Sequence, residues 1–314
     1  MRAVTVDSVP AAPAVTEADT PRPEAGELLV KVAAASVNGF DLAVAAGYLN
    51  GMMEHRFPLV LGKDFAGTVE ALGADVEGFA VGDGVFGVVT KPFLGTGSLA
   101  EYVTVSAGQG VAPLPAGLAV ADAGALGVAG ATAVDSLDAV APAEDETVLI
   151  SGAGGGVGSL AVQLAVARGA RVIATARPGA QTDFVTGLTG TGAEVHVVDF
   201  TGDLEAQVHA IAPDGVDAVL HLAGDGAQLA GLLRPGGRIA SPVGLTQDAV
   251  KDPDVIVHPI MADPNVPTLT ALAEQVASGA LRVPVTATYP LERAAEAFTA
   301  FSSGTPGKIA IACS

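Results

Sequence analysis

A glycine-rich turn near the middle of the chain carries the clearest chemistry in this sequence. Residues 147–169 read TVLISGAGGGVGSLAVQLAVARG, which is a short apolar strand, a turn and an apolar helix that ends at a glycine. Small residues in such a turn let the backbone approach a pyrophosphate, and the first N–H groups of the helix face the phosphates. The segment therefore predicts a dinucleotide site. Its predicted residues are Ala153, Gly155, Gly156, Val157 and Gly158.

The end of the next apolar run indicates which dinucleotide binds. Sites for NAD place an Asp or Glu there, some twenty residues after the turn, to hold the ribose hydroxyls. This chain has Thr175, Ala176 and Arg177 instead. An arginine without a competing carboxylate favours a 2′-phosphate, so NADPH is the predicted cofactor, with Thr175 and Arg177 in its site. The alternative is that Arg177 is a solvated loop residue.

The elements that must position this turn follow from the apolar pattern. Near-continuous apolar runs start at residues 147, 171, 194, 217, 237 and 254, and segments of helical length separate them. That alternation is typical of a six-stranded, doubly wound parallel sheet with helices on both faces. Residues 1–120 contain shorter β-rich segments between Gly and Pro, which predicts a β-barrel. The tail leaves the strand-helix alternation, so we expect it to pack on that first part.

Composition excludes several classes of function. The chain has 314 residues, 15 Lys and Arg against 34 Asp and Glu, and a net charge of −19, which disfavours nucleic acid and membrane surfaces as partners. The single cysteine, Cys313, can form neither an intrachain disulfide nor a cysteine-rich zinc site. The start of the chain lacks the pattern of a signal peptide, and a cytoplasmic protein is expected.

Several motifs in order resemble one known family. They are ASVNGFDLAVAAGYL (35–49), LGKDFAGTVEALG (61–73), VGDGVFG (81–87), GSLAEYVTV (97–105), ALGVAGATAV (125–134), LLRPGGRIAS (232–241) and PGKIAI (306–311). Together with the glycine turn, they resemble the medium-chain dehydrogenase/reductase superfamily, in its zinc-free quinone oxidoreductase branch, which contains the relatives of zeta-crystallin. The resemblance implies an α/β fold in which a GroES-like β-barrel catalytic domain (1–120 and 263–314) accompanies a Rossmann domain (121–262).

The same comparison bears on metal binding. Where zinc-dependent alcohol dehydrogenases of the superfamily carry Cys and His ligands, this chain has Asn38 and Lys63, with Gly124 near the third position. A protonated lysine has no lone pair to give and glycine has no side chain. The five histidines show no ligand spacing either. A zinc-independent protein is therefore expected.

The resemblance places Asn38, Asp41 and Tyr48 in the catalytic region. Asn38 would contact cofactor or substrate, Asp41 would order the loop, and Tyr48 would serve as a donor or as a stacking wall. Plainer roles are open for each: the first two as caps of a turn or helix, and Tyr48 as a rim aromatic. Many relatives have a tyrosine where this chain has Ala43, which opens the cleft.

Further residues are predicted at the cofactor. They are Thr132 in the interdomain segment, Phe200 beside adenine, Ala223 at the carboxyl end of a strand, and Lys308 in the PGK segment. Capping, core packing and plain solvation are their alternatives. Lys63 and Asp64 are interpreted as a structural turn and a surface pair.

These features predict an NADPH-dependent reductase that transfers hydride to quinones or related α,β-unsaturated carbonyls. Such acceptors delocalise the incoming charge onto oxygen, so a reductase of this type needs rigid cofactor binding and hydrogen-bond donors rather than a metal. The alternatives are an enoyl or alkenal double-bond reductase, including one of secondary metabolism, and an NADPH-binding sensor without turnover. A homodimer is expected, and the sequence leaves the physiological substrate, the proton donor and the pathway open.

Overall fold

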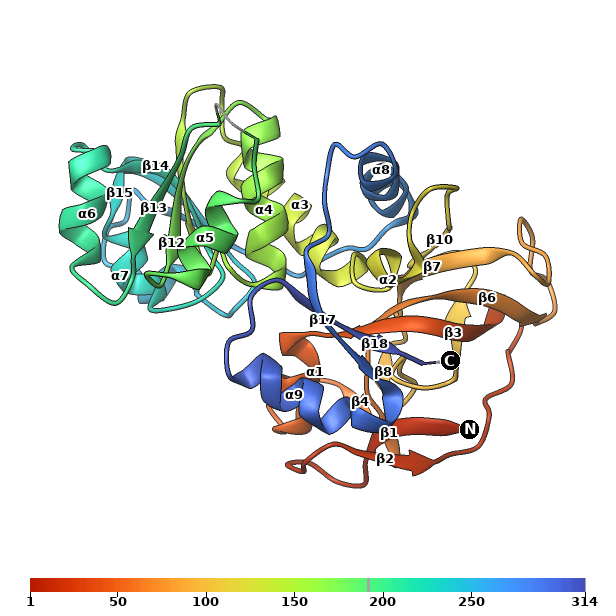
Figure 1. The fold of residues 1–314 in the computed structure, drawn as a ribbon. Coiled ribbons are helices and arrows are strands. Elements are labelled where there is room, and N and C mark those ends of the chain that lie inside the picture. The colour runs from red at the N-terminus through yellow and green to blue at the C-terminus, as the bar shows by residue number, and fades with distance from the viewer. Residues whose placement is uncertain (191–192, 314) are drawn as a thin grey trace. The chain divides into compact units, whose positions relative to one another are not determined.

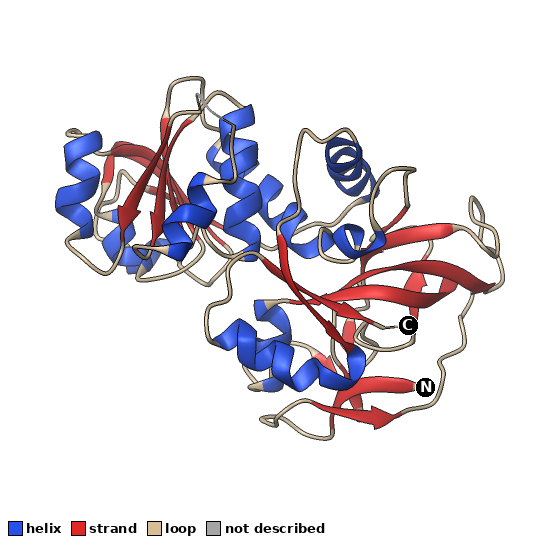
Figure 2. Cartoon of the chain, viewed as in Figure 1, coloured by secondary structure: helices blue, strands red, loops and turns tan. Residues whose placement is uncertain are grey.

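The structure is a computed structural model that describes residues 1–190 and 193–313. The chain divides into two compact units. Unit 1 comprises Met1–Ala129 and Pro264–Ser314, and unit 2 comprises Gly130–Asp263. Strands dominate unit 1, whereas strands and helices alternate in unit 2 (Figure 2). The domain boundaries expected from the sequence, after residues 120 and 262, stay a prediction.

Unit 2 is built on one six-stranded sheet in which all strand pairs are parallel. Its strands are almost continuously apolar because helices cover both faces, and Leu149, Ile173 and Val219 are fully buried. The strand order is β13-β12-β11-β14-β15-β16, so the predicted doubly wound sheet is confirmed. The strands are β11 (Thr147–Ser151), β12 (Arg171–Ala176), β13 (Val195–Asp199), β14 (Val216–His221), β15 (Leu233–Ser241) and β16 (Ile256–Pro259).

The helices of unit 2 connect these strands. In Figure 1, α6 and α4 lie on opposite sides of the strands. Aspartates cap two of the helices: Asp203 accepts the N–H of Ala206 at 3.0 Å, and Asp225 accepts the N–H of Ala227 at 2.9 Å. The helices are α4 (Gly156–Ala167), α5 (Ala180–Thr186), α6 (Leu204–Ile211) and α7 (Gly226–Ala230), with a 3₁₀ turn η1 (Gln247–Ala249).

Unit 1 contains a seven-stranded sheet that joins both ends of the chain. Along its main path the order is β10-β7-β6-β3-β18-β17, and β9 also pairs with β3. The last strand, β18, is antiparallel to β3 and sets Ile309 opposite Val37. This pairing brings residues near the C-terminus beside the start of the first helix. The strands are β3 (Glu27–Val37), β6 (Asp64–Leu72), β7 (Gly84–Val88), β9 (Tyr102–Ser106), β10 (Val111–Pro113), β17 (Val285–Pro290) and β18 (Lys308–Ala312).

Smaller sheets and helices complete unit 1. The strands β2, β1 and β5 form a three-stranded sheet, and β4 pairs with β8. Helix α3 (Gly127–Val140) begins in unit 1 and continues into unit 2. The other elements are β1 (Arg2–Val6), β2 (Ala14–Glu17), β4 (Glu54–His55), β5 (Leu59–Val60), β8 (Phe93–Leu94), α1 (Gly39–Ala45), α2 (Val120–Ala123), α8 (Val266–Ala277), η2 (Leu291–Arg293) and α9 (Ala294–Ser302). In the part of the chain that the structure describes, no helix is long and apolar enough to cross a membrane.

Candidate functional site

The glycine turn of unit 2 connects β11 to α4. Gly152 has a φ of +69°, a conformation that glycine adopts without strain, and its N–H donates to the hydroxyl of Thr175 at 3.0 Å. Gly155 is the N-cap of α4 and donates to the carbonyl of Gly152 at 3.0 Å. The first N–H groups of α4 have no partner inside the helix. The turn thus presents free backbone donors at the carboxyl end of β11.

The space for a side chain differs between Gly158 and Gly155 of the turn. A Cβ on Gly158 would lie 2.2 Å from the carbonyl oxygen of Gly152, so the helix and the turn pack too closely for a side chain. A Cβ on Gly155 would meet no protein atom closer than 3.4 Å. The fold itself therefore does not require glycine at residue 155. A bare backbone that reaches solvent at a helix N-terminus fits a dinucleotide pyrophosphate.

Other predicted cofactor residues lie at the carboxyl ends of neighbouring strands. Thr175 is near the end of β12 with its hydroxyl bound to the turn, and Arg177 follows that strand with an exposed side chain. The Arg177 guanidinium lies 5.6 Å from the centroid of the Phe200 ring, which follows β13 and is 42% exposed. Ala223 follows β14, and its N–H donates to the hydroxyl of Ser151 at 3.3 Å. These residues border the edge of the sheet where open α/β folds bind ligands.

The two remaining predicted cofactor residues lie elsewhere in the fold. Thr132 is a buried residue of α3. Lys308 opens β18 in unit 1, is 3% exposed, and donates to Asn38 and Asp64. The structure therefore groups Lys308 with Asn38 and Asp41, two of the three predicted catalytic residues. Contact of Thr132 or Lys308 with a cofactor stays a prediction.

A buried polar cluster joins β3, α1, β6, α3 and β18. Its centre is Asp64, which is 0% exposed. The carboxylate accepts hydrogen bonds from the Ser36 hydroxyl at 2.6 Å, the Asn38 amide at 2.9 Å and the Val128 N–H at 2.6 Å. Lys308 Nζ lies 3.4 Å from Asp64 Oδ2 and 2.6 Å from Asn38 Oδ1. A buried charge needs such compensation, and the lysine supplies the opposite charge.

Asp41 fixes the start of α1 to the segment between β5 and β6. One carboxylate oxygen accepts the N–H of Asn38 at 2.8 Å, and the other accepts the N–H of Gly62 at 3.1 Å. Burial raises the pKa of Asp41 from its usual 3.8 to about 7, although the bond from Asn38 opposes that rise. Asn38 and Asp41 therefore hold neighbouring segments of the chain in place. Direct contact of either residue with a substrate stays a prediction.

The interpretation of Lys63 and Asp64 as a surface pair is wrong. Asp64 begins β6 fully buried, and its carboxylate bonds to other residues. Lys63 is partly buried, with Nζ 5.3 Å from the centroid of the Phe40 ring. Burial lowers the pKa of Lys63, while the charges of Asp41 and Asp64 oppose the decrease. Neighbouring residues of an extended segment point in opposite directions, which separates the two charges.

The donor set in this region does not fit a zinc ion. At the positions compared with zinc ligands, Asn38 already gives its amide oxygen to the Lys308 ammonium, and Lys63 supplies a second ammonium. The ammonium groups of Lys308 and Lys63 both repel a divalent cation. Gly124 offers no ligand, and a Cβ there would lie 2.6 Å from the carbonyl oxygen of Ala34. Within residues 1–190 and 193–313, no cluster of three His, Cys, Asp or Glu side chains has the geometry to hold a metal ion.

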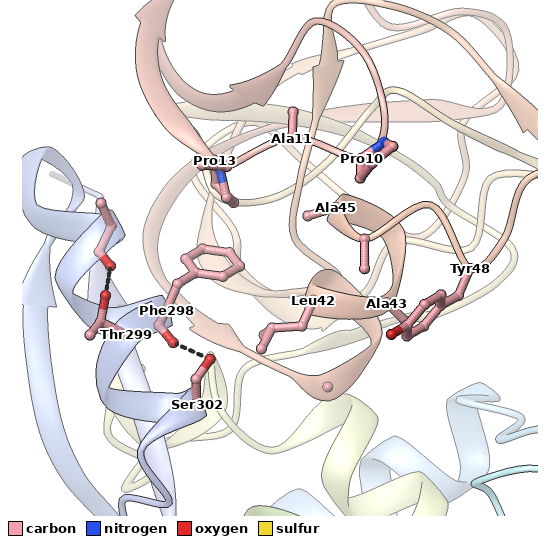
Figure 3. Close-up of a pocket in the computed structure, with 14 residues that line it drawn as sticks. Pro10, Ala11, Pro13, Leu42, Ala43, Ala45, Tyr48, Phe298, Thr299 and Ser302 are labelled. Atoms are coloured by element: carbon pink, nitrogen blue, oxygen red, sulfur yellow. Dashed lines mark hydrogen bonds between the residues drawn. The ribbon is translucent and has the colours of Figure 1, made fainter.

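An open apolar groove of about 1060 Å³ lies on the outer side of α1. Leu42 and Ala43 of α1 face Phe298 of α9 across it, and Pro10 and Pro13 border it (Figure 3). The hydroxyls of Thr299 and Ser302 donate to carbonyls of their own helix, so their protons are already engaged. Tyr48, which is 76% exposed, lies at the groove near Ala43. Ala43 thus lies on an apolar surface, and its role in opening the cleft stays a prediction.

Several residues of these sites were missed by sequence reasoning. Ser36 and Asp64 anchor the buried cluster, and the Ser151 hydroxyl ties the ends of β11 and β14 together through the N–H groups of Leu222 and Ala223. The Gln181 side chain accepts the N–H of Arg177 at 2.7 Å. One signal was available: an aspartate that opens an otherwise apolar strand must find buried partners.

Comparisons with known proteins agree with this architecture. Residues 24–116 match the family described as "Alcohol dehydrogenase GroES-like domain", and residues 191–311 match "Zinc-binding dehydrogenase". The spinach protein named "Quinone-oxidoreductase homolog, chloroplastic" is 35% identical over 65% of this chain. That alignment covers 62% of the spinach protein, which is less than two thirds of its length.

Two further comparisons cover more of the chain. The human protein named "NAD(P)H oxidoreductase RTN4IP1, mitochondrial" is 31% identical over 88% of this chain and 79% of its own length. A solved structure of the quinone oxidoreductase from Coxiella burnetii has a TM-score of 0.86 and 28% identity, and the match covers 99% of each chain. The resemblance inferred from the motifs and the predicted fold class are thereby confirmed. The chain belongs to the medium-chain dehydrogenase/reductase superfamily, in its quinone oxidoreductase branch.

Proposed function

We propose that this oxidoreductase is a zinc-independent enzyme that uses NADPH to reduce quinones or related α,β-unsaturated carbonyls. The observation that carries the proposal is the glycine turn together with Arg177. The turn offers free helix N–H groups, and the guanidinium of Arg177 is exposed at the end of β12. Among the described residues, no carboxylate forms an ion pair with that guanidinium. An unopposed arginine at the ribose position suits a 2′-phosphate.

The bound cofactor would supply the hydride, and the protein would supply orientation and charge. Gly155, Gly156 and Val157 would hold the pyrophosphate, and Phe200 would flank the adenine beside Arg177. The acceptor would bind against the segment that includes Asn38 and Tyr48. Conjugated acceptors suit a site that has ammonium groups and no metal ligands, because their negative charge develops on oxygen.

Cofactor choice is the first test. Titration of the protein with NADPH and NADH should give tighter binding of NADPH, and Arg177→Ala should weaken NADPH about tenfold to a hundredfold, which corresponds to the loss of hydrogen bonds to a charged group. NADH binding should change little in that variant. Arg22→Ala removes another exposed arginine and serves as the matched control. Equal affinities for both cofactors in the parent protein would refute the NADPH assignment.

Turnover is the second test. NADPH consumption should be steady with a simple benzoquinone or with an enone, and it should persist after exhaustive chelation. Stoichiometric zinc whose removal abolishes turnover would overturn zinc independence. Tight NADPH binding without consumption across both acceptor classes would instead indicate a cofactor-binding protein without catalysis.

A further inference from the structure

Lys63 is an ammonium group near Asp41, one of the predicted catalytic residues. Among the described residues, no hydrogen bond or ion pair joins its Nζ to an oxygen, and its contact is the face of the Phe40 ring at 5.3 Å. A cation over an aromatic ring is held by the charge distribution of the ring. That contact uses none of the three N–H donors, so they remain available to a ligand.

The two carboxylates near Lys63 are committed to other partners. Asp64 is surrounded by Ser36, Asn38, Val128 and Lys308. Asp41 accepts two backbone N–H groups. Both carboxylates lie near enough to stabilise the charge of Lys63, yet neither takes a hydrogen bond from it. The two carboxylates therefore stabilise the Lys63 ammonium without accepting its hydrogen bonds.

The backbone at Lys63 is fixed on both sides. The N–H of Gly62 donates to Asp41 at 3.1 Å, and the carbonyl of Lys63 accepts the N–H of Val89 at 2.8 Å. Phe40 belongs to α1, whose start is also bound by Asp41. The buried contacts of Asp41 thus fix both the lysine and the ring beneath it. A donor held in this way needs little reorganisation when charge develops nearby.

We propose that Lys63 donates a proton to the oxygen of the bound acceptor, which makes it a catalytic residue that the sequence comparison did not identify. The proposal rests on the reductase function proposed above. With an enone, a hydride from the nicotinamide cofactor forms a C–H bond at the β-carbon, and the C=C electron pair moves to leave negative charge on oxygen. Lys63 gives that oxygen a proton and regains one from water. The resulting enol then rearranges to the saturated ketone.

The direction of the pKa shift of Lys63 suits this task. Burial lowers the pKa of the ammonium, and an acid whose pKa is nearer the working pH transfers its proton more readily. Tyr48 is less suited, because its side chain is exposed and water competes for the hydroxyl. Lys308 is engaged by two buried acceptors.

The first experiment tests, in the absence of cofactor, whether the positive charge of Lys63 binds an anionic oxygen. The probe is 4-nitrophenol, whose ionised oxygen resembles that of a partly reduced acceptor and whose absorbance reports ionisation. The parent protein should bind the phenolate in preference to the phenol. Lys63→Met should weaken phenolate binding about tenfold or more, whereas Lys63→Arg should retain it, because arginine keeps the charge. Lys31→Met, which removes an exposed lysine of β3, is the matched control and should bind like the parent.

The second experiment separates proton donation from charge. Lys63→Met and Lys63→Arg should both lower enone turnover about a hundredfold, because neither side chain gives up a proton near neutral pH. Quinone turnover should fall by a similar factor, because hydride addition to a quinone also leaves negative charge on an oxygen beside Lys63. Parent-like phenolate binding by Lys63→Met, or parent-like enone turnover in both Lys63→Met and Lys63→Arg, would overturn the role of Lys63. A parent protein that reduces neither class refutes the reductase function instead, a result that the phenolate titration does not share.

Discussion

The ammonium of Lys308 lies 2.6 Å from the amide oxygen of Asn38, although 270 positions separate the two residues in the chain. The pairing of β18 with β3 brings them together, because it sets Ile309 opposite Val37. The same ammonium lies 3.4 Å from Asp64. One lysine near the C-terminus thus balances a buried carboxylate and orients the amide that precedes α1.

Replacement of Lys308 should therefore destabilise the fold. Lys308→Met keeps the size of the side chain but leaves the Asp64 carboxylate and the Asn38 oxygen buried without their cation. Loss of one partner of a buried pair costs about 3–5 kcal/mol, and we expect a decrease of that order in the free energy of unfolding in urea. Lys251→Met, at an exposed position, should change it little.

A second variant separates charge from packing at this site. Asp64→Asn combined with Lys308→Met removes both charges, so the pair of changes should destabilise the protein by less than the sum of the two single changes. Strict additivity would show that the two residues do not interact through their charges.

Asp41 should make stability depend on pH. Because the unfolded carboxyl ionises near 3.8 and the folded one near 7, the folded state holds more protons between these values. Stability from this group is therefore greatest below about pH 4 and decreases as the pH rises to 7. The decrease is up to about 4 kcal/mol, since each pKa unit corresponds to about 1.4 kcal/mol.

Comparison with Asp41→Asn isolates this effect, because asparagine does not titrate. The free energy of unfolding of the parent, minus that of the variant, should decrease steadily from pH 4 to pH 7 and then level off. A difference that stays constant over this range would show that Asp41 is ionised in the folded protein throughout.

The sheet of unit 2 could be predicted because its signal is local. Buried parallel strands are apolar over their whole length, and each of the six strands overlaps its predicted run. The glycine turn was also predictable, because a strand, small residues and a helix follow one another directly in sequence.

The buried cluster could not be predicted, because its partners are distant in sequence. Asp64 bonds to Ser36 across 28 positions and to Lys308 across 244. No periodic pattern records such contacts. Two adjacent charged residues, Lys63 and Asp64, indicate a surface turn by composition, but the extended chain sends one side chain inward and leaves the other partly exposed.

Gly155 and Gly158 of the glycine turn should respond differently to alanine. Gly158→Ala sets a Cβ 2.2 Å from the Gly152 oxygen, so the turn must shift, and we expect stability to decrease by about 1–3 kcal/mol. Gly155→Ala meets no protein atom within 3.4 Å and has a φ of −83°, so its melting temperature should stay near that of the parent.

Gly155→Ala, which should leave stability unchanged, should weaken dinucleotide binding. Its methyl group would occupy space that the bare backbone offers to a pyrophosphate, and NADPH affinity should decrease at least tenfold in a fully folded variant. A Gly155→Ala protein that binds NADPH like the parent would show that the pyrophosphate does not approach this residue.

Substitutions of Tyr48 distinguish a stacking wall from a proton donor in the proposed acceptor site. Its exposed ring lies beside Ala43, where a planar acceptor can stack on it. If the ring is a wall, Tyr48→Phe should leave kcat nearly unchanged for quinones and enones, and Tyr48→Ala should raise KM about tenfold for both, because one aromatic contact is worth about 0.5–1.5 kcal/mol. Saturating NADPH and a deuterated cofactor show whether hydride transfer limits the rate. A selective decrease in kcat for enones with Tyr48→Phe would instead identify the phenol as the donor to the α-carbon, because only an enone needs a proton placed on carbon.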